Sequence, residues 1–191
     1  LSPVTQERTT AMTVNFSIGQ GLGFNFTQTY LPPYDQTAAI SATNDPSNPP
    51  LPCAIGTHGL GSGGSEYIFV LAGAAIAANQ WVVITPVTYS TVVGTKLLAT
   101  QQAGQFGIAQ VAIASGSYGW IAIRGSALTV LAKLGTLANV KVYASSSNGR
   151  VVGSTSFNSG VLTGITLTQS TTSARLAGGV TCHATWPRLL V

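Results

Sequence analysis

Charge is scarce in this sequence of 191 residues. Asp, Glu, Lys and Arg together make up 6% of it, whereas about 25% is usual for soluble domains. Eight basic residues outnumber the four acidic ones, Glu7, Asp35, Asp45 and Glu66, and give a net charge of +4. The basic residues are scattered, and nucleic-acid binding needs clustered cations that displace counterions from phosphates. We therefore expect no direct nucleic-acid partner.

So few ionisable side chains also disfavour catalysis. General acid–base and glycosidase chemistry require carboxylates or histidines positioned as pairs, and only Glu66 lies outside the first 45 residues. The glycine-rich stretches "GSGGS" (61–65) and "SGSYG" (115–119) do not fit the G-x-S-x-G motif of serine hydrolases. "GLGSGG" (59–64) lacks the preceding strand and following helix of a dinucleotide site. We predict a non-enzymatic protein with no catalytic residue and no cofactor.

Cysteine and histidine are equally rare. A Cys₂His₂ metal site would need all four of Cys53, His58, Cys182 and His183. Neighbouring residues in a strand point to opposite faces, so Cys182 and His183 cannot easily reach one ion. Two cysteines are also too few for a disulfide framework. We expect free, small, buried cysteines and no metal site.

Long apolar runs are missing, although 45% of the residues are hydrophobic and the mean hydropathy is +0.36. The longest uninterrupted run, 68–78, is about half of the ~20 residues that a membrane-spanning helix needs. The first residues of the printed sequence lack the basic start and apolar core of a signal peptide. We expect no membrane partner.

What the sequence does contain is a succession of short β-like runs from Glu66 onward, most of them separated by Gly, Ser or Asn. Short strands at near-regular spacing predict an all-β domain, a small antiparallel barrel or sandwich. The segment 127–138 ("ALTVLAKLGTLA") fits either a helix or a strand followed by a turn. The predicted strands lie within "EYIFVLA" (66–72), "QWVVITP" (80–86), "FGIAQVAIA" (106–114), "YGWIAIRG" (118–125), "NVKVYA" (139–144), "GRVVGS" (149–154), "GITLTQS" (164–170) and "GVTCHATW" (179–186).

The first third of the chain has a different composition. Residues 31–52 contain six of the nine prolines, which fix φ and remove backbone donors, so an extended arm or loop is expected there. Upstream, alternating apolar residues in 11–30 predict two short strands around Gly19–Gly21. We therefore predict an extended proline-rich N-terminal arm, residues 1–58, and a β-barrel or sandwich domain, residues 59–191.

A β-rich chain with so few charges has little protection against association. Natural sheets guard their open edges with lysine, other charges and proline, and charged surfaces keep domains soluble. We infer that other chains cover much of this surface, and that a long arm clasps a neighbour. The composition thus indicates a component of an assembly.

Three stretches carry a resemblance to a known family. They are "GSGGSEYIFVLAGAAIAANQWVVI" (61–84), "QFGIAQVAIASGSYGWIAIRGSA" (105–127) and "ATWP" (184–187). Together they resemble a pattern found in small structural proteins of tailed-phage heads, the capsid decoration or cement proteins. The resemblance covers roughly the C-terminal two-thirds of the chain and none of residues 1–55. Few acidic residues and a proline-rich arm set this chain apart from the pattern.

The resemblance implies a structural virion protein on the outside of the capsid. Its expected partners are the major capsid protein and further copies of itself, in a homotrimer at a symmetry axis of the shell. Binding would stabilise the shell against expansion, since a ligand that binds only the assembled state favours that state.

Six residues are candidates for an interface or for packing: Trp81, Trp120, Trp186, Arg124, Tyr30 and Tyr34. Trp120 and Arg124 have the same parity in their predicted strand, so they share a face with Ala122 between them. We favour core packing for Trp120. Arg124 could pair with a carbonyl or with Glu66, or could lie in a contact between subunits, where Trp and Arg are common anchors.

An alternative function remains open at this point. Exposed aromatic residues on a β face can stack on a base or on a sugar ring. The chain would then be a receptor- or glycan-binding head protein on the phage surface.

Overall fold

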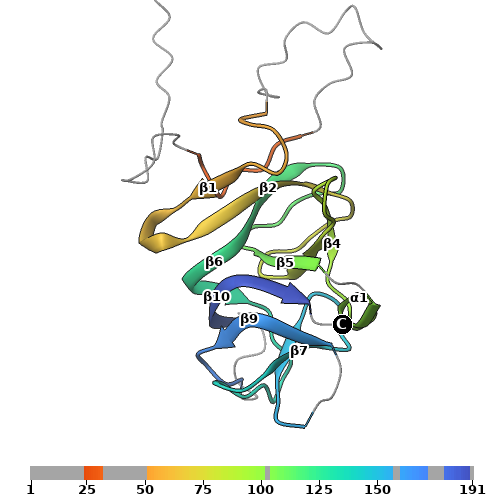
Figure 1. The fold of residues 1–191 in the computed structure, drawn as a ribbon, viewed down its shortest axis with the longest axis vertical. Helices are drawn as coiled ribbons and strands as arrows, with labels where there is room; N and C mark the ends of the chain where they lie inside the picture. Colours follow the sequence, from red (N-terminus) through yellow and green to blue (C-terminus); the bar gives the residue numbers. More distant parts are fainter. Residues whose placement is uncertain (1–23, 32–50, 102–103, 157–159, 172–178, 190–191) are drawn as a thin grey trace, which may run out of the picture.

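The computed structural model describes residues 24–31, 51–101, 104–156, 160–171 and 179–189. This part of the chain is 47% strand and 5% helix, which confirms the all-β prediction. Its ten strands form one continuous sheet, part of which closes on itself (Figure 1). The two strands predicted within 11–30 fall largely outside the described residues.

Five strands close into a small barrel. In order around the ring they are β2 (Glu66–Ala72), β4 (Ser90–Val93), β3 (Trp81–Ile84), β5 (Gly104–Ala109) and β6 (Tyr118–Val130). The ring is complete because β6 pairs with β5 on one side and with β2 on the other. β2 and β4 run parallel, and the other neighbours in the ring run antiparallel. The predicted barrel is therefore present, with one parallel pair.

A second layer of strands extends from the barrel along β6. β6 is 13 residues long, and its second half pairs with β10 (Val180–Leu189). Beyond β10 follow β9 (Val161–Leu167), β7 (Val142–Ala144) and β8 (Val151–Gly153) (Figure 1). The pairing of β6 with β10 contains a bulge between Cys182 and Ala184. A bulge bends a strand locally, which lets β6 belong to both layers.

The smaller elements include two that the sequence did not predict, β4 and helix α1 (Lys96–Gln101). Thr95 caps the helix, since its Oγ1 accepts a hydrogen bond from the backbone N–H of Leu98 at 3.1 Å. Strand β1 (His58–Leu60) pairs with β2, and the single 3₁₀ turn η1 (Ser62–Gly64) joins these two strands. Within the described ranges, neither helical element has the length and apolar composition that crossing a bilayer requires.

The segment 127–138 forms a strand followed by a turn. β6 continues through Val130, and a turn over residues 133–136 follows. This turn is one of six in the described residues in which the fourth residue donates its N–H to the first carbonyl and the third residue has a positive φ. Only a residue that tolerates positive φ fits the third position, which favours Gly or Asn. The six turns are 54–57, 62–65, 77–80, 114–117, 133–136 and 147–150, with Gly56, Gly64, Asn79, Gly116, Gly135 and Gly149 in that position.

The barrel wall is apolar on both faces. On β6, Ile121 and Ile123 point into the barrel, where they join Ile68 and Val70 of β2 in one buried cluster. Residues of the opposite parity, such as Ala122, lie on the outer face and are buried as well. Continuous apolar runs are typical of strands that are buried on both sides. The outer face must therefore be covered by other parts of the chain.

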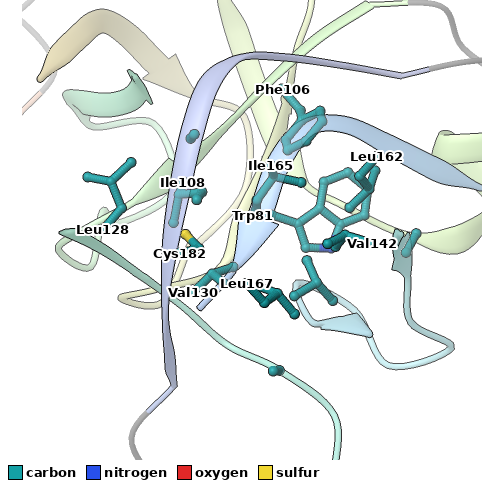
Figure 2. Close-up of a cluster of buried hydrophobic side chains, with 14 of the residues drawn as sticks. Trp81, Phe106, Ile108, Leu128, Val130, Val142, Leu162, Ile165, Leu167 and Cys182 are labelled. Atoms are coloured by element: carbon teal, nitrogen blue, oxygen red, sulfur yellow. The ribbon is translucent and has the colours of Figure 1, made fainter. Parts of the chain in front are cut away.

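The second layer covers one side of the outer face. Trp81 of β3 and Phe106 and Ile108 of β5 pack against side chains of the second layer, among them Leu162 of β9 and Cys182 of β10 (Figure 2). Trp81 is fully buried, and its indole Nε1 donates a hydrogen bond to the carbonyl oxygen of Arg150 at 3.0 Å. Trp81 thus joins the barrel to the second layer.

The interior of the barrel is narrow enough to require a glycine. A Cβ built on Gly107 would lie 2.4 Å from Cγ2 of Ile121 and 2.8 Å from the carbonyl oxygen of Ala122. Gly104, on the same strand, has far more space, since its Cβ would meet only the carbonyl oxygen of Ile84 at 3.9 Å. A substitution at Gly104 is therefore a control for the same substitution at Gly107.

We expect Gly107→Ala to destabilise the fold by about 1–3 kcal/mol, because an added methyl group overpacks the barrel interior. Gly104→Ala should change the free energy of unfolding by less than about 0.5 kcal/mol. Urea denaturation followed by far-UV circular dichroism measures both. Equal effects of the two substitutions would contradict the tight packing around Gly107.

Candidate functional site

Two described segments of the predicted arm pack against the side of the barrel that the second layer does not cover. Residues 24–31 and 51–57 lie over the outer face of β2 and β6, where an aromatic cluster forms. The barrel supplies Tyr67 and Phe69 from β2 and Tyr118 and Trp120 from β6, which we call the aromatic face. Residues 24–31, called the covering segment, supply the residues that pack on it. The predicted boundary at residue 58 stays a prediction, but these parts of the arm are not separate from the barrel.

The covering segment places aromatic rings on Trp120 and Tyr67. Phe26 stacks on Tyr67 at a centroid distance of 4.4 Å and meets Trp120 edge-on at 5.0 Å. Phe24 lies 4.8 Å from Trp120. Each aromatic pair contributes about 0.5–1.5 kcal/mol beyond the apolar area it buries. A Cβ on Gly59 would lie 2.5 Å from the Phe26 ring, so this close approach requires glycine.

Tyr30 binds the covering segment to the backbone of β6 through two hydrogen bonds. Its N–H donates to the carbonyl of Tyr118 at 2.8 Å, and its carbonyl accepts from the N–H of Tyr118 at 2.7 Å. The Tyr30 ring is buried, at 5.7 Å from the ring of Phe69. Earlier in the segment, Oδ1 of Asn25 accepts hydrogen bonds from the N–H and Oγ1 of Thr27. This local turn places Phe24 and Phe26 on the same side.

Trp120 is buried without a hydrogen bond for its indole group. Its side chain is 1% exposed, and Nε1 has no hydrogen-bond partner among the described residues. Burying an unpaired donor costs about 1–3 kcal/mol. The covered arrangement therefore gains aromatic contacts at the expense of one unsatisfied donor.

The other candidate residues are Trp81, Arg124, Trp186 and Tyr34, and of these Trp81 lies in the cluster between the barrel and the second layer. Arg124 is exposed, and it is the register partner of Glu66 in β2 and of Thr185 in β10. The predicted pairing of Arg124 with Glu66 or a carbonyl stays a prediction. Trp186 belongs to β10, and Tyr34 lies outside the described residues. The structure therefore brings Tyr30 and Trp120 together and places Trp81 in a different cluster.

The cysteines and ionisable groups offer little reactive chemistry. Cys182 is free and buried between the layers, and burial raises the pKa of its thiol to about 12, so it stays protonated. Cys53 is free and half-buried in the aromatic cluster, where burial also raises its pKa. His58 Nδ1 lies 2.7 Å from Oε1 of Glu66. In the part of the chain that is described, no three His, Cys, Asp or Glu side chains come together as a metal site would require.

Three exposed apolar side chains belong to segments that adjoin the covered face in the chain or through the contacts of Gly56. Leu31 follows Tyr30 and is 56% exposed, Ile55 is 38% exposed and Val87 is 88% exposed. Ile55 precedes Gly56, whose N–H bonds to the carbonyl of Phe69. A Cβ on Gly56 would meet the ring of Tyr89, which belongs to the same loop as Val87. We call Leu31, Ile55 and Val87 the apolar rim.

Val87 is held in a strained conformation. Its φ is 72°, and the N–H of Thr88 bonds to the carbonyl of Pro86 at 2.9 Å across it. A β-branched residue with positive φ is a genuine outlier, and such strain clusters at sites where a protein makes functional contacts. The loop is closed by a further bond from Tyr89 N–H to the Thr85 carbonyl. It thus displays one apolar side chain to solvent.

A shallow depression beside the covering segment is also uncharged. Its lining includes Thr29 of the covering segment and also Ile76 and Ile113, which pair with each other in an isolated antiparallel β-bridge. Its remaining lining is Ala75, Ala77, Gln80, Val93, Ala112, Ala114 and Asn148. Aliphatic, hydroxyl and amide groups of this kind suit contact with another protein surface.

Comparison with known proteins gives no match: no protein-family model, no curated protein and no solved structure corresponds to this chain. The candidate site is therefore defined by its own geometry.

Replacing each buried tryptophan by phenylalanine separates their roles. Both substitutions remove the same ring atoms, but Trp81→Phe also removes the hydrogen bond from the indole to the Arg150 carbonyl, which keeps its second bond, from the Ser145 N–H. A hydrogen bond contributes about 0.5–1.5 kcal/mol, whereas Trp120→Phe removes a donor that has no partner among the described residues. We therefore expect Trp81→Phe to lower the free energy of unfolding by about 1 kcal/mol more than Trp120→Phe. Urea denaturation followed by circular dichroism measures the difference. An equal or larger loss for Trp120→Phe would contradict the assignment.

Proposed function

We propose that this chain is a decoration or cement protein of a tailed phage, which binds the outside of the major capsid shell and stabilises it. The observation that carries the proposal is the apolar rim, placed beside the covering segment on a molecule with 6% charged residues. Apolar side chains that are exposed together can form the centre of a protein–protein contact. The resemblance of residues 61–84 and 105–127 to head proteins supports the same conclusion.

The positions of the residues that flank the proline-rich segment 32–50 also support the proposal. Tyr30 and Cys53 flank this segment, and both side chains pack in the aromatic cluster. The segment therefore starts and ends at the face that carries the apolar rim. In our proposal the arm reaches over neighbouring capsid proteins from this face, and copies of the chain associate as a homotrimer.

A glycan-binding head protein is less well supported. Stacking on sugar rings needs exposed aromatic faces, and Trp81 and Trp120 are both buried. We therefore do not propose this function.

Particles purified from the source should contain the chain in an integral ratio to the major capsid protein. Repeated binding to equivalent sites on a symmetric lattice fixes that ratio. Quantitative mass spectrometry of intact particles measures it. Absence of the chain from particles would overturn the proposal.

Val87→Asp should weaken binding to capsids that lack the chain by at least about tenfold, because a charge would be buried at the contact. Asp tolerates positive φ better than Val, so the fold should not suffer. Leu134→Asp is the matched control, since Leu134 is 46% exposed in the second layer, at the turn 133–136. Cosedimentation with capsids measures both, and equal effects would contradict a contact through the rim.

The same assay should show little dependence on salt. Raising NaCl from about 0.05 M to about 0.5 M should change the apparent affinity by less than about threefold, because the chain has few charges to screen. Loss of binding at high salt would instead indicate an electrostatic contact.

A further inference from the structure

The covering segment is a small unit with a long connection to the barrel. Residues 24–31 make their backbone contact with β6 through Tyr30 alone, in two hydrogen bonds to Tyr118, and their side-chain contacts through Phe24, Phe26 and Tyr30. About 20 residues separate Leu31 from Leu51, and a chain of that length reaches up to ~65 Å when extended. The segment could therefore lie on the barrel of a different copy and keep every one of these contacts.

Packing of the covering segment on the aromatic face of its own chain leaves one buried donor unsatisfied within the described ranges, the indole N–H of Trp120. This N–H has no partner among the described residues, and the rings of Phe24 and Phe26 pack on the same indole. Lifting these two rings exposes more of the indole, and a donor that reaches water regains the hydrogen bond that it lacks when buried. Opening exposes the aromatic face, and this face binds any identical segment equally well.

The connecting sequence favours the exchanged arrangement. Pro32-Pro33 and Pro49-Pro50 stand at its two ends, and proline restricts both its own φ and the residue before it to extended conformations. Extended residues at both ends suit a long reach, as a connection between two copies needs. Exchange of an identical element needs no new interface, so its main cost is the entropy of association.

We propose that the aromatic face of one copy binds residues 24–31 of a second copy, so that the chain associates with itself by exchanging its covering segment. The exchange also places Leu31, which is 56% exposed within one chain, at the boundary between two copies. The inference deepens the homotrimer of the proposed function, but it does not rest on binding to a capsid, so the exchange and capsid binding can each fail without the other.

Disulfide trapping between two different chains tests the exchange. Tyr30 and Tyr118 are partners in an antiparallel bridge, where Cα atoms lie about 5.5 Å apart, within reach of a disulfide. Tyr30→Cys and Tyr118→Cys are made separately in a Cys53→Ser background, because Cys53 lies in the same cluster. Cys182 is retained, since it is buried with a raised pKa.

The two single-cysteine proteins are mixed, refolded together and oxidised. We expect a disulfide-linked dimer of one chain of each kind on a non-reducing gel, and no such dimer from either protein alone. The double variant, with both cysteines in one chain, is the control for geometry. Monomers only in the mixture, with complete internal disulfide formation in the double variant, would overturn the proposal.

A second measurement uses the unmodified chain, in case the cysteine variants do not fold. Isotope-labelled and unlabelled protein are refolded together, and isotope-filtered NOE spectra select contacts between chains. We expect cross-peaks between the Phe26 ring of one chain and the Trp120 ring of another, which are 5.0 Å apart between centroids. A monomer at the NMR concentration, or an oligomer without these cross-peaks, would overturn the exchange.

Discussion

The structure depends on a barrel wall that is apolar on both faces. Five short strands can enclose only a narrow interior, filled by side chains such as Ile68, Val70 and Ile121. The same strands carry Trp81, Phe106 and Trp120 on their outer face, and these must also be removed from water. One side is covered by β7, β9 and β10, and the other by two short segments near the N-terminus. The two covers differ in kind, since the first is a hydrogen-bonded sheet and the second is mainly a set of aromatic rings.

This difference decides which contacts are fixed and which can change partners. The second layer is tied to the barrel by β6, which runs through both, and by the hydrogen bond from Trp81 to Arg150. The covering segment has one backbone bridge, and the donor of Trp120, on which its rings pack, has no partner in the described part of the chain. Apolar rings without charged neighbours discriminate little between segments of one chain and of another. In the proposed assembly, a sequence with only 6% charged residues would favour such contacts between copies.

Much of the fold was accessible from the sequence, because period-two alternation and turn residues are local properties. The runs 66–72, 118–125 and 179–186 fall within strands β2, β6 and β10. β4 was missed although β3, β7 and β8 are no longer than it. α1 was missed because a helix of six residues is too short to show a periodicity. The aromatic face did leave a sequence signature that was not used: Phe24-x-Phe26, Tyr67-x-Phe69 and Tyr118-x-Trp120 repeat one spacing. Their convergence depends on strand order, which residue spacing does not encode.

The length of β6 has a mechanical consequence. Because one strand of 13 residues is hydrogen-bonded to β2 and β5 at one end and to β10 at the other, tension applied to β10 is transmitted directly into the closed ring. Antiparallel strands pulled along their length resist by many hydrogen bonds at once, whereas strands peeled from one end yield bond by bond. The two layers should therefore rupture together, as a single cooperative unit.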